Sequence, residues 1–111
     1  MSIIIVTRHK GLVEWLAQQG ITGQVISHVD DPSQIKRRVV YGILPFHLAS
    51  QALAVVTVDM PGLKPEQRGV DISPAEMDDA GAFLRAYIIR PLAGDIAASA
   101  KAADAALYHG A

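Results

Sequence analysis

Five consecutive residues near the start of the chain combine side chains suited to binding and cleaving an anionic substrate. They are Thr7, Arg8, His9, Lys10 and Gly11, and they follow a nearly continuous run of β-branched residues. Arginine holds phosphate through a bidentate fork, lysine attracts it as a point charge, and histidine exchanges protons near neutral pH. The stretch therefore predicts a phosphate site with acid–base chemistry. A merely solvated side chain for Arg8 and a structural role for His9 remain open alternatives.

A second group of small, basic or acidic residues follows later apolar runs in the sequence. The group comprises Gly42, Pro45 and His47 after one run, Asp59 after the next, and Arg68 with Gly69 in the loop beyond. Right-handed crossovers bring the carboxyl ends of parallel strands to one sheet edge, where ligands bind. Helix starts at that edge offer N–H groups to an anion. We expect Arg8, His9, His47 and Arg68 to share one cleft there.

The elements that would position these residues follow from the apolar patterns. Continuous apolar runs predict buried strands, and apolar residues at helical spacing predict helices. The expected strands span 2–7, 24–29, 38–43 and 54–59, and the expected helices span 12–19, 46–52 and 73–90. The last of these begins at a capping box with proline at its first position. This order indicates an α/β, Rossmann-like three-layer domain with a mostly parallel four-stranded sheet.

Composition limits the chain to one such domain. A length of 111 residues suits a single core, which we place in residues 1–90, followed by an Ala-rich helical extension over 91–111. The absence of cysteine fits a reducing compartment, and no apolar run reaches the roughly 20 residues of a membrane span, so a cytoplasmic location is expected. A formal charge of −1 disfavours a duplex-binding protein but leaves a small anionic ligand possible.

Other polar residues receive structural interpretations from the sequence. His28 and His109 are expected to be structural or exposed, and 36–38 (Lys-Arg-Arg) to form a solvated rim. No spacing supports a metal site, and neither a Walker loop, a dinucleotide fingerprint nor a nucleophile elbow is present. We therefore expect no cofactor and no metal.

Three segments together resemble a known family. They are Val6-Thr7-Arg8-His9-Lys10-Gly11 with Val13-Glu14-Trp15, then Gly42-Ile43-Leu44-Pro45-Phe46-His47-Leu48-Ala49, and finally Asp59-Met60-Pro61 with Arg68-Gly69 and the helix start 73–78. In this order the chain resembles the small CRISPR-associated proteins of type III systems that form family sixteen of the Csx group. The resemblance covers about residues 3–90 and leaves out the Ala-rich extension.

The resemblance implies a ring nuclease that cleaves cyclic oligoadenylate, the second messenger of type III CRISPR defence, with cyclic tetra-adenylate the expected ring. It also implies a Rossmann-like fold and a homodimer that places the ring across its two-fold axis. Without metal, a ribose 2′-hydroxyl attacks the adjacent phosphorus and leaves a 2′,3′-cyclic phosphate. We assign charge stabilisation to Arg8, with Arg68 as a second clamp, and proton transfer to His9 or His47 without deciding between them.

Two alternatives accompany this interpretation. The Arg-His pair after the first strand is also similar to that of histidine phosphatases, but the chain is short for that fold and Lys10 interrupts their Arg-His-Gly core. A binding module that sequesters the cyclic nucleotide without cutting it would use the same residues.

Overall fold

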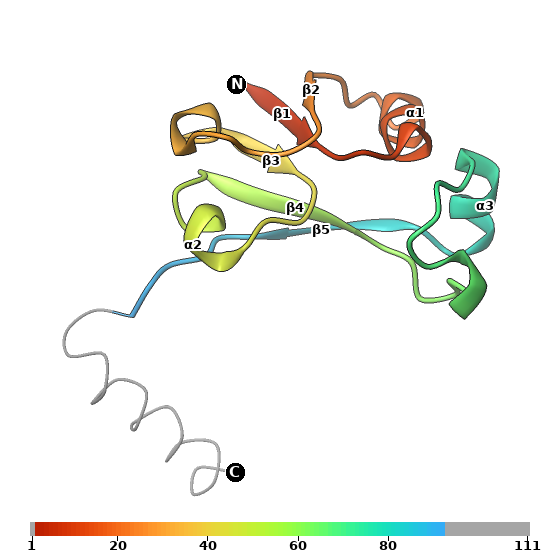
Figure 1. Cartoon of the computed structure of the whole chain (residues 1–111). Coiled ribbons are helices and arrows are strands. Elements are labelled where there is room, and N and C mark those ends of the chain that lie inside the picture. Colours follow the sequence, from red (N-terminus) through yellow and green to blue (C-terminus); the bar gives the residue numbers. More distant parts are fainter. Residues whose placement is uncertain (1, 93–111) are drawn as a thin grey trace, which may run out of the picture.

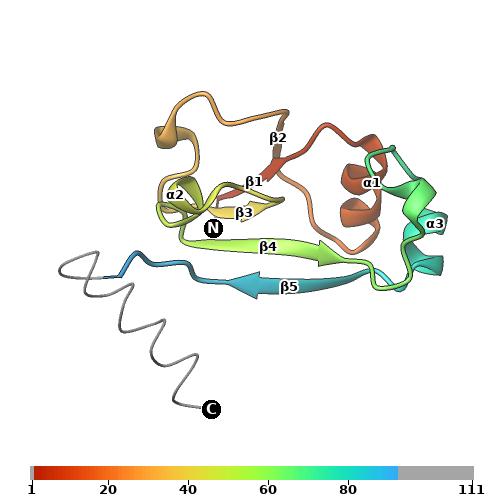
Figure 2. The ribbon, with the colours of Figure 1, turned by 60° about the horizontal axis from the view of Figure 1, so that its bottom comes forward.

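The computed structural model of the chain describes residues 2–92, which form a central five-stranded sheet covered by short helices (Figure 1). The strand order is β2-β1-β3-β4-β5. The first four strands are parallel and β5 runs antiparallel to β4, as the opposed arrows in Figure 2 show. The strands are β1 (Ile3–Val6), β2 (Gln24–Ile26), β3 (Val39–Tyr41), β4 (Ala54–Asp59) and β5 (Phe83–Tyr87).

Helices lie on both faces of the sheet. The helical elements are α1 (Lys10–Gln18), α2 (Phe46–Ala49) and α3 (Pro74–Asp79), with 3₁₀ turns η1 (Pro32–Gln34) and η2 (Pro65–Gln67). Successive side chains of a strand point to opposite faces, so β1 contributes to two separate cores. Ile4 packs with Ala49 of α2, and Ile5 packs with Trp15 of α1 and Met77 of α3. The α/β, Rossmann-like three-layer prediction is thereby confirmed.

The predicted helix over 73–90 is wrong in its second half, and the sheet has five strands rather than four. α3 ends at Asp79, and Gly81 follows it with φ +76°, a left-handed conformation that glycine adopts without strain. The chain then returns as β5 beside β4, with Phe83 opposite Asp59 and Tyr87 opposite Val55. Leu84 and Tyr87, which suggested a helical stripe, are partly exposed strand residues instead.

Arg38 also departs from the expectation of a solvated rim. Its guanidinium donates to Gln24 Oε1 at 3.1 Å, to the Gln34 carbonyl at 3.0 Å and to the Ile3 carbonyl at 3.3 Å. This side chain therefore links the beginnings of β1 and β2 to the turn η1.

Two further expectations concern the C-terminal extension and the absence of membrane-spanning helices. The predicted Ala-rich helical extension lies outside the described residues, apart from Pro91 and Leu92. Within residues 2–92, no helix has the length and apolar character needed to cross a bilayer.

Candidate functional site

An open pocket of about 650 Å³ lies at the carboxyl ends of β1, β2 and β3. β2 lies on one side of β1 and β3 on the other, so this is the switch point at which ligands bind in such sheets. Its walls are mainly apolar and include Leu12 of α1, Tyr41 of β3 and Leu63 of the loop after β4. The volume falls within the range of small-molecule sites, which is about 300–1,000 Å³.

Six of the residues predicted from the sequence line this pocket: Thr7, Arg8, His9, Gly42, Pro45 and Gly69. The first three follow β1, and the side chains of Arg8 and His9 are exposed to solvent. The strand-end argument therefore locates the pocket correctly and brings an arginine and a histidine into it.

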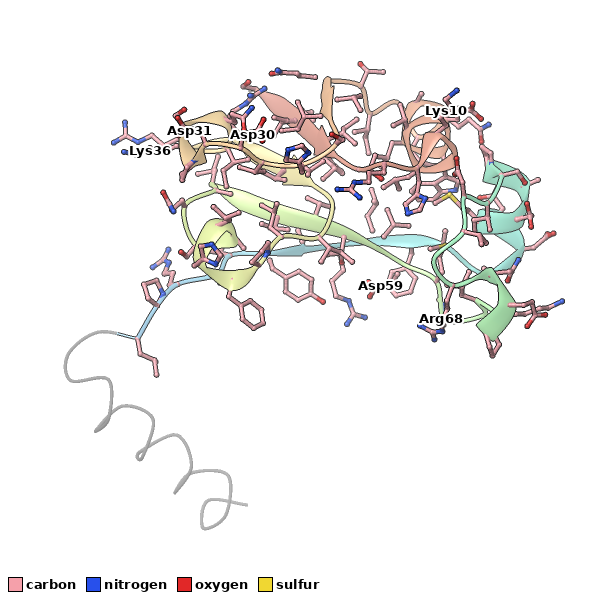
Figure 3. The ribbon with its side chains drawn as sticks, viewed as in Figure 1. Lys10, Asp30, Asp31, Lys36, Asp59 and Arg68 are labelled. Carbon is pink, nitrogen blue, oxygen red and sulfur yellow. The ribbon has the colours of Figure 1, made fainter. Side chains whose placement is uncertain are left out.

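The other five predicted residues lie outside the lining of this pocket: Lys10, Gly11, His47, Asp59 and Arg68. Figure 3 shows Lys10, the first residue of α1, well separated from Asp59 and Arg68. His47 is exposed on α2, and Arg68 is exposed in the loop between β4 and α3. The expectation of one shared cleft is thus confirmed for Arg8 and His9 and is wrong for His47 and Arg68. The chain passes the pocket at both places, since Pro45 and Leu48 line it on either side of His47 and Gln67 and Gly69 line it on either side of Arg68. The side chains of His47 and Arg68 themselves are exposed and do not take part in the lining.

A carboxylate of the protein itself is bound at the start of α1. The Asp71 carboxylate accepts the backbone N–H of Lys10 at 3.1 Å and that of Gly11 at 3.0 Å. Asp71 therefore binds two of the N–H groups that helix geometry leaves free. The expectation that this helix start is open to an anionic ligand is wrong. A Cβ at Gly11 would lie 1.7 Å from the Ile72 carbonyl oxygen, so the close approach of this loop requires glycine.

Gly42 shapes the floor of the pocket. It has φ +137°, and a Cβ there would lie 2.3 Å from the Val6 carbonyl oxygen. Glycine thereby allows the chain to turn away from β3 close against the end of β1.

Asp59 takes part in the pairing of β4 with β5. Its carboxylate accepts the Thr57 hydroxyl at 3.1 Å and lies 3.4 Å from Nε of Arg85. Arg85 in turn stacks over the Phe83 ring, with 5.4 Å between the guanidinium carbon and the ring centroid. The partners of Asp59 therefore lie on β4 and β5, on the face of β4 that α2 covers. Asp59 is not part of the pocket lining.

His28 is a second histidine of the pocket, which the sequence interpretation took to be structural or exposed. Ser27 and His28 follow β2 and line the pocket together with Arg8 and His9. Nε2 of His28 lies 2.6 Å from Asp30 Oδ1, and Nδ1 lies 3.1 Å from Ser27 Oγ. The strand-end rule did not find His28 because the expected strand 24–29 contains it, whereas β2 ends at Ile26 and leaves His28 in the loop that follows.

Among residues 2–92, no group of three or more histidine, aspartate or glutamate side chains is arranged to hold a metal ion. The polar side chains that line the pocket instead supply one guanidinium, two imidazoles, the Asp71 carboxylate, the Gln67 amide, and hydroxyls from Thr7, Ser27 and Tyr41. Such a set can bind an anion, stabilise developing negative charge and transfer protons.

A comparison with protein families matches residues 4–90 to the family described as "Putative CRISPR-associated protein (Cas_VVA1548)". The chain belongs to this family. The match extends from β1 through β5 and so includes every strand of the sheet and the whole pocket lining of this CRISPR-associated protein. Searches of curated proteins and of solved structures found no match.

Proposed function

We propose that this CRISPR-associated protein is a ring nuclease that cleaves cyclic oligoadenylate, as the resemblance to family sixteen of the Csx group implies. The observation that carries the proposal is the pocket at the β1–β3 switch point, which combines Arg8 and His9 with apolar walls. Apolar and aromatic walls suit the faces of nucleobases, and Arg8 suits a phosphodiester.

The proposed reaction is an in-line attack by a ribose 2′-hydroxyl on the adjacent phosphorus, which gives a 2′,3′-cyclic phosphate and a free 5′-hydroxyl. Arg8 stabilises the negative charge that develops on the phosphoryl oxygens, and His9 takes part in proton transfer. The proposal assigns no metal or cofactor to the reaction. A cyclic tetranucleotide is larger than a pocket of this size, so part of the ring would extend beyond the pocket lining.

The decisive experiment incubates the protein with cyclic tetra-adenylate, with and without a chelator, and separates the products. Linear products with 2′,3′-cyclic phosphate ends that persist in chelator support the proposal. Tight binding with an intact ring contradicts cleavage and supports sequestration, in which the same pocket holds the messenger away from its effectors. Absence of both binding and cleavage contradicts both functions.

We also propose that the protein forms a homodimer through β5. β5 lies at one edge of the sheet and pairs with β4, and no strand lies on its outer side within the described residues. All five of its residues are exposed, including Phe83, Leu84 and Tyr87. Such an edge is a template for pairing with another strand. At the opposite edge, β2 has three residues and a smaller apolar surface.

The side chains of β5 favour one antiparallel register. A two-fold axis at Arg85 would place two guanidinium groups opposite each other, which is unfavourable. An axis at Ala86 places Leu84 of one copy opposite Ile88 of the other, and Arg85 opposite Tyr87, an aromatic ring that attracts a cation. Two copies would then share one continuous sheet.

A further inference from the structure

His28 lies between a carboxylate and a hydroxyl, in contact distance of both. Its Nε2 lies 2.6 Å from Asp30 Oδ1 and its Nδ1 lies 3.1 Å from Ser27 Oγ. Of the three histidines that the structure describes, His28 is the one whose ring carries hydrogen-bonding partners. Both Ser27 and His28 line the same pocket as Arg8 and His9.

The two partners determine where the proton of a neutral His28 ring lies. A carboxylate accepts hydrogen bonds, so Asp30 holds the proton on Nε2. Nδ1 then carries the lone pair, and the Ser27 hydroxyl donates to it. Nδ1, the ring atom that can accept a proton, therefore already accepts a hydrogen bond from a hydroxyl group. It would accept the same hydrogen bond from a substrate hydroxyl.

We propose that His28 is the general base of the reaction and that Asp30 is its positioning residue; this inference rests on the proposed ring-nuclease function. The 2′-hydroxyl of the substrate takes the place of the Ser27 hydroxyl at Nδ1 and transfers its proton there. The O2′–phosphorus bond forms as the phosphorus–O5′ bond breaks. The leaving O5′ takes a proton from the protonated ring of His9, and His28 later returns its proton to solvent while His9 regains one.

The His28–Asp30 pair contributes little to the stability of the surrounding turn, so a purely structural role does not account for it. The 30–35 turn is already held by other bonds: the Gln34 side-chain oxygen accepts the backbone N–H of Asp30 at 2.8 Å, and Asp31 accepts that of Ser33 at 3.0 Å. The side chains of His28 and Asp30 are 59% and 73% exposed, and ion pairs so exposed contribute little to stability. The same exposure leaves the ring accessible to a ligand.

The neighbouring carboxylates Asp30 and Asp31 provide a matched test. Single-turnover cleavage of cyclic tetra-adenylate is measured for the wild type and for His28→Ala, Asp30→Asn and Asp31→Asn. We expect His28→Ala to lower the rate constant by about 10²-fold or more with little change in binding, as the loss of a general base does. Asp30→Asn should give a smaller loss, and Asp31→Asn, which alters a carboxylate that binds Ser33, should retain the wild-type rate.

Two further readouts separate proton transfer from structural support. Added imidazole should restore part of the cleavage by His28→Ala, because the small base can enter the space left by an exposed ring. ¹⁵N NMR of the wild type at neutral or higher pH should show the neutral ring protonated on Nε2, and Asp30→Asn should shift the tautomer ratio. Protonation mainly on Nδ1 in the wild type would overturn the inference.

The failures of the two proposals are distinguishable. A wild type that cleaves, together with His28→Ala that cleaves equally fast, overturns the role of His28 and leaves the ring nuclease intact. The role is also overturned if His28→Ala cleaves more slowly only because it binds the substrate more weakly and if added imidazole does not restore cleavage. A wild type that does not cleave overturns the proposed function and, with it, this role for His28.

Discussion

The backbone N–H of Gly11 donates to the carboxylate of Asp71 at 3.0 Å and so joins the start of α1 to the loop that precedes α3. That loop forms one wall of the pocket through Leu63 and Val70. The bond therefore fixes this wall relative to the segment that carries Arg8 and His9. Asp71 itself also borders a small recess next to Lys10.

Asp71→Ala should lower the free energy of unfolding and should not weaken ligand binding. Loss of a side chain that accepts helix N-terminal N–H groups costs about 1 kcal/mol. The same change removes a negative charge next to the helix start, so an anionic ligand should bind as tightly or more tightly. Urea unfolding and titration with cyclic tetra-adenylate measure the two effects. Asp79→Ala, an exposed carboxylate at the end of α3, is the control; an equal loss of stability in both variants would contradict the role of Asp71.

Gly11→Ala should destabilise the protein although alanine is the better helix former. The added Cβ would lie 1.7 Å from the Ile72 carbonyl oxygen, so the loop must move away from α1. Overpacking of this kind costs about 1–3 kcal/mol. Thermal unfolding followed by circular dichroism checks the prediction. Gly20→Ala meets no atom within 4 Å and tests the separate cost of a positive φ; a stabilised Gly11→Ala variant would show that the loop yields freely.

The sequence predicts the parallel part of the fold because buried strands such as 54–59 are nearly continuous apolar runs. It locates the pocket through the strand-end rule, which places Arg8 and His9 correctly. It fails at β5, because the exposed residues Leu84 and Tyr87 match a helical spacing as well as a strand. It also fails for His47, since the direction of a side chain on a four-residue helix depends on packing that spacing does not encode.

Arg8→Ala should reduce the cleavage of cyclic tetra-adenylate by about 10²-fold or more, because a preorganised donor to the developing negative charge is lost. Arg8→Lys should retain part of the activity, since it keeps the charge but not the bidentate fork. Arg90→Ala, which removes an exposed arginine after β5, provides the matched control. Product analysis under single-turnover conditions measures the rates, and wild-type cleavage by Arg8→Ala would remove this residue from the mechanism.

Ala86→Lys should weaken self-association through β5, because the proposed two-fold axis would bring two lysines together. Sedimentation over a range of protein concentrations should show a monomer–dimer equilibrium for the wild type and a shift toward monomer for the variant. Thr22→Lys places the same charge beside β2 at the opposite edge of the sheet and should leave the equilibrium unchanged. A monomeric wild type, or equal effects of both lysines, would argue against pairing of β5.

Glu76→Gln should be less stable than the wild type at neutral pH, and the difference should decrease in acid. The pKa of Glu76 is lowered, chiefly because its carboxylate accepts the backbone N–H of Ser73, the N-cap of α3. A carboxylate whose pKa is lower in the folded state stabilises the protein at pH values above its ordinary pKa of 4.5. This stabilisation disappears as the pH falls through the folded-state pKa. Urea unfolding of both proteins at neutral pH and at several acidic pH values tests this, and a difference that stays constant across the series would show that the charge of Glu76 has no part in capping α3.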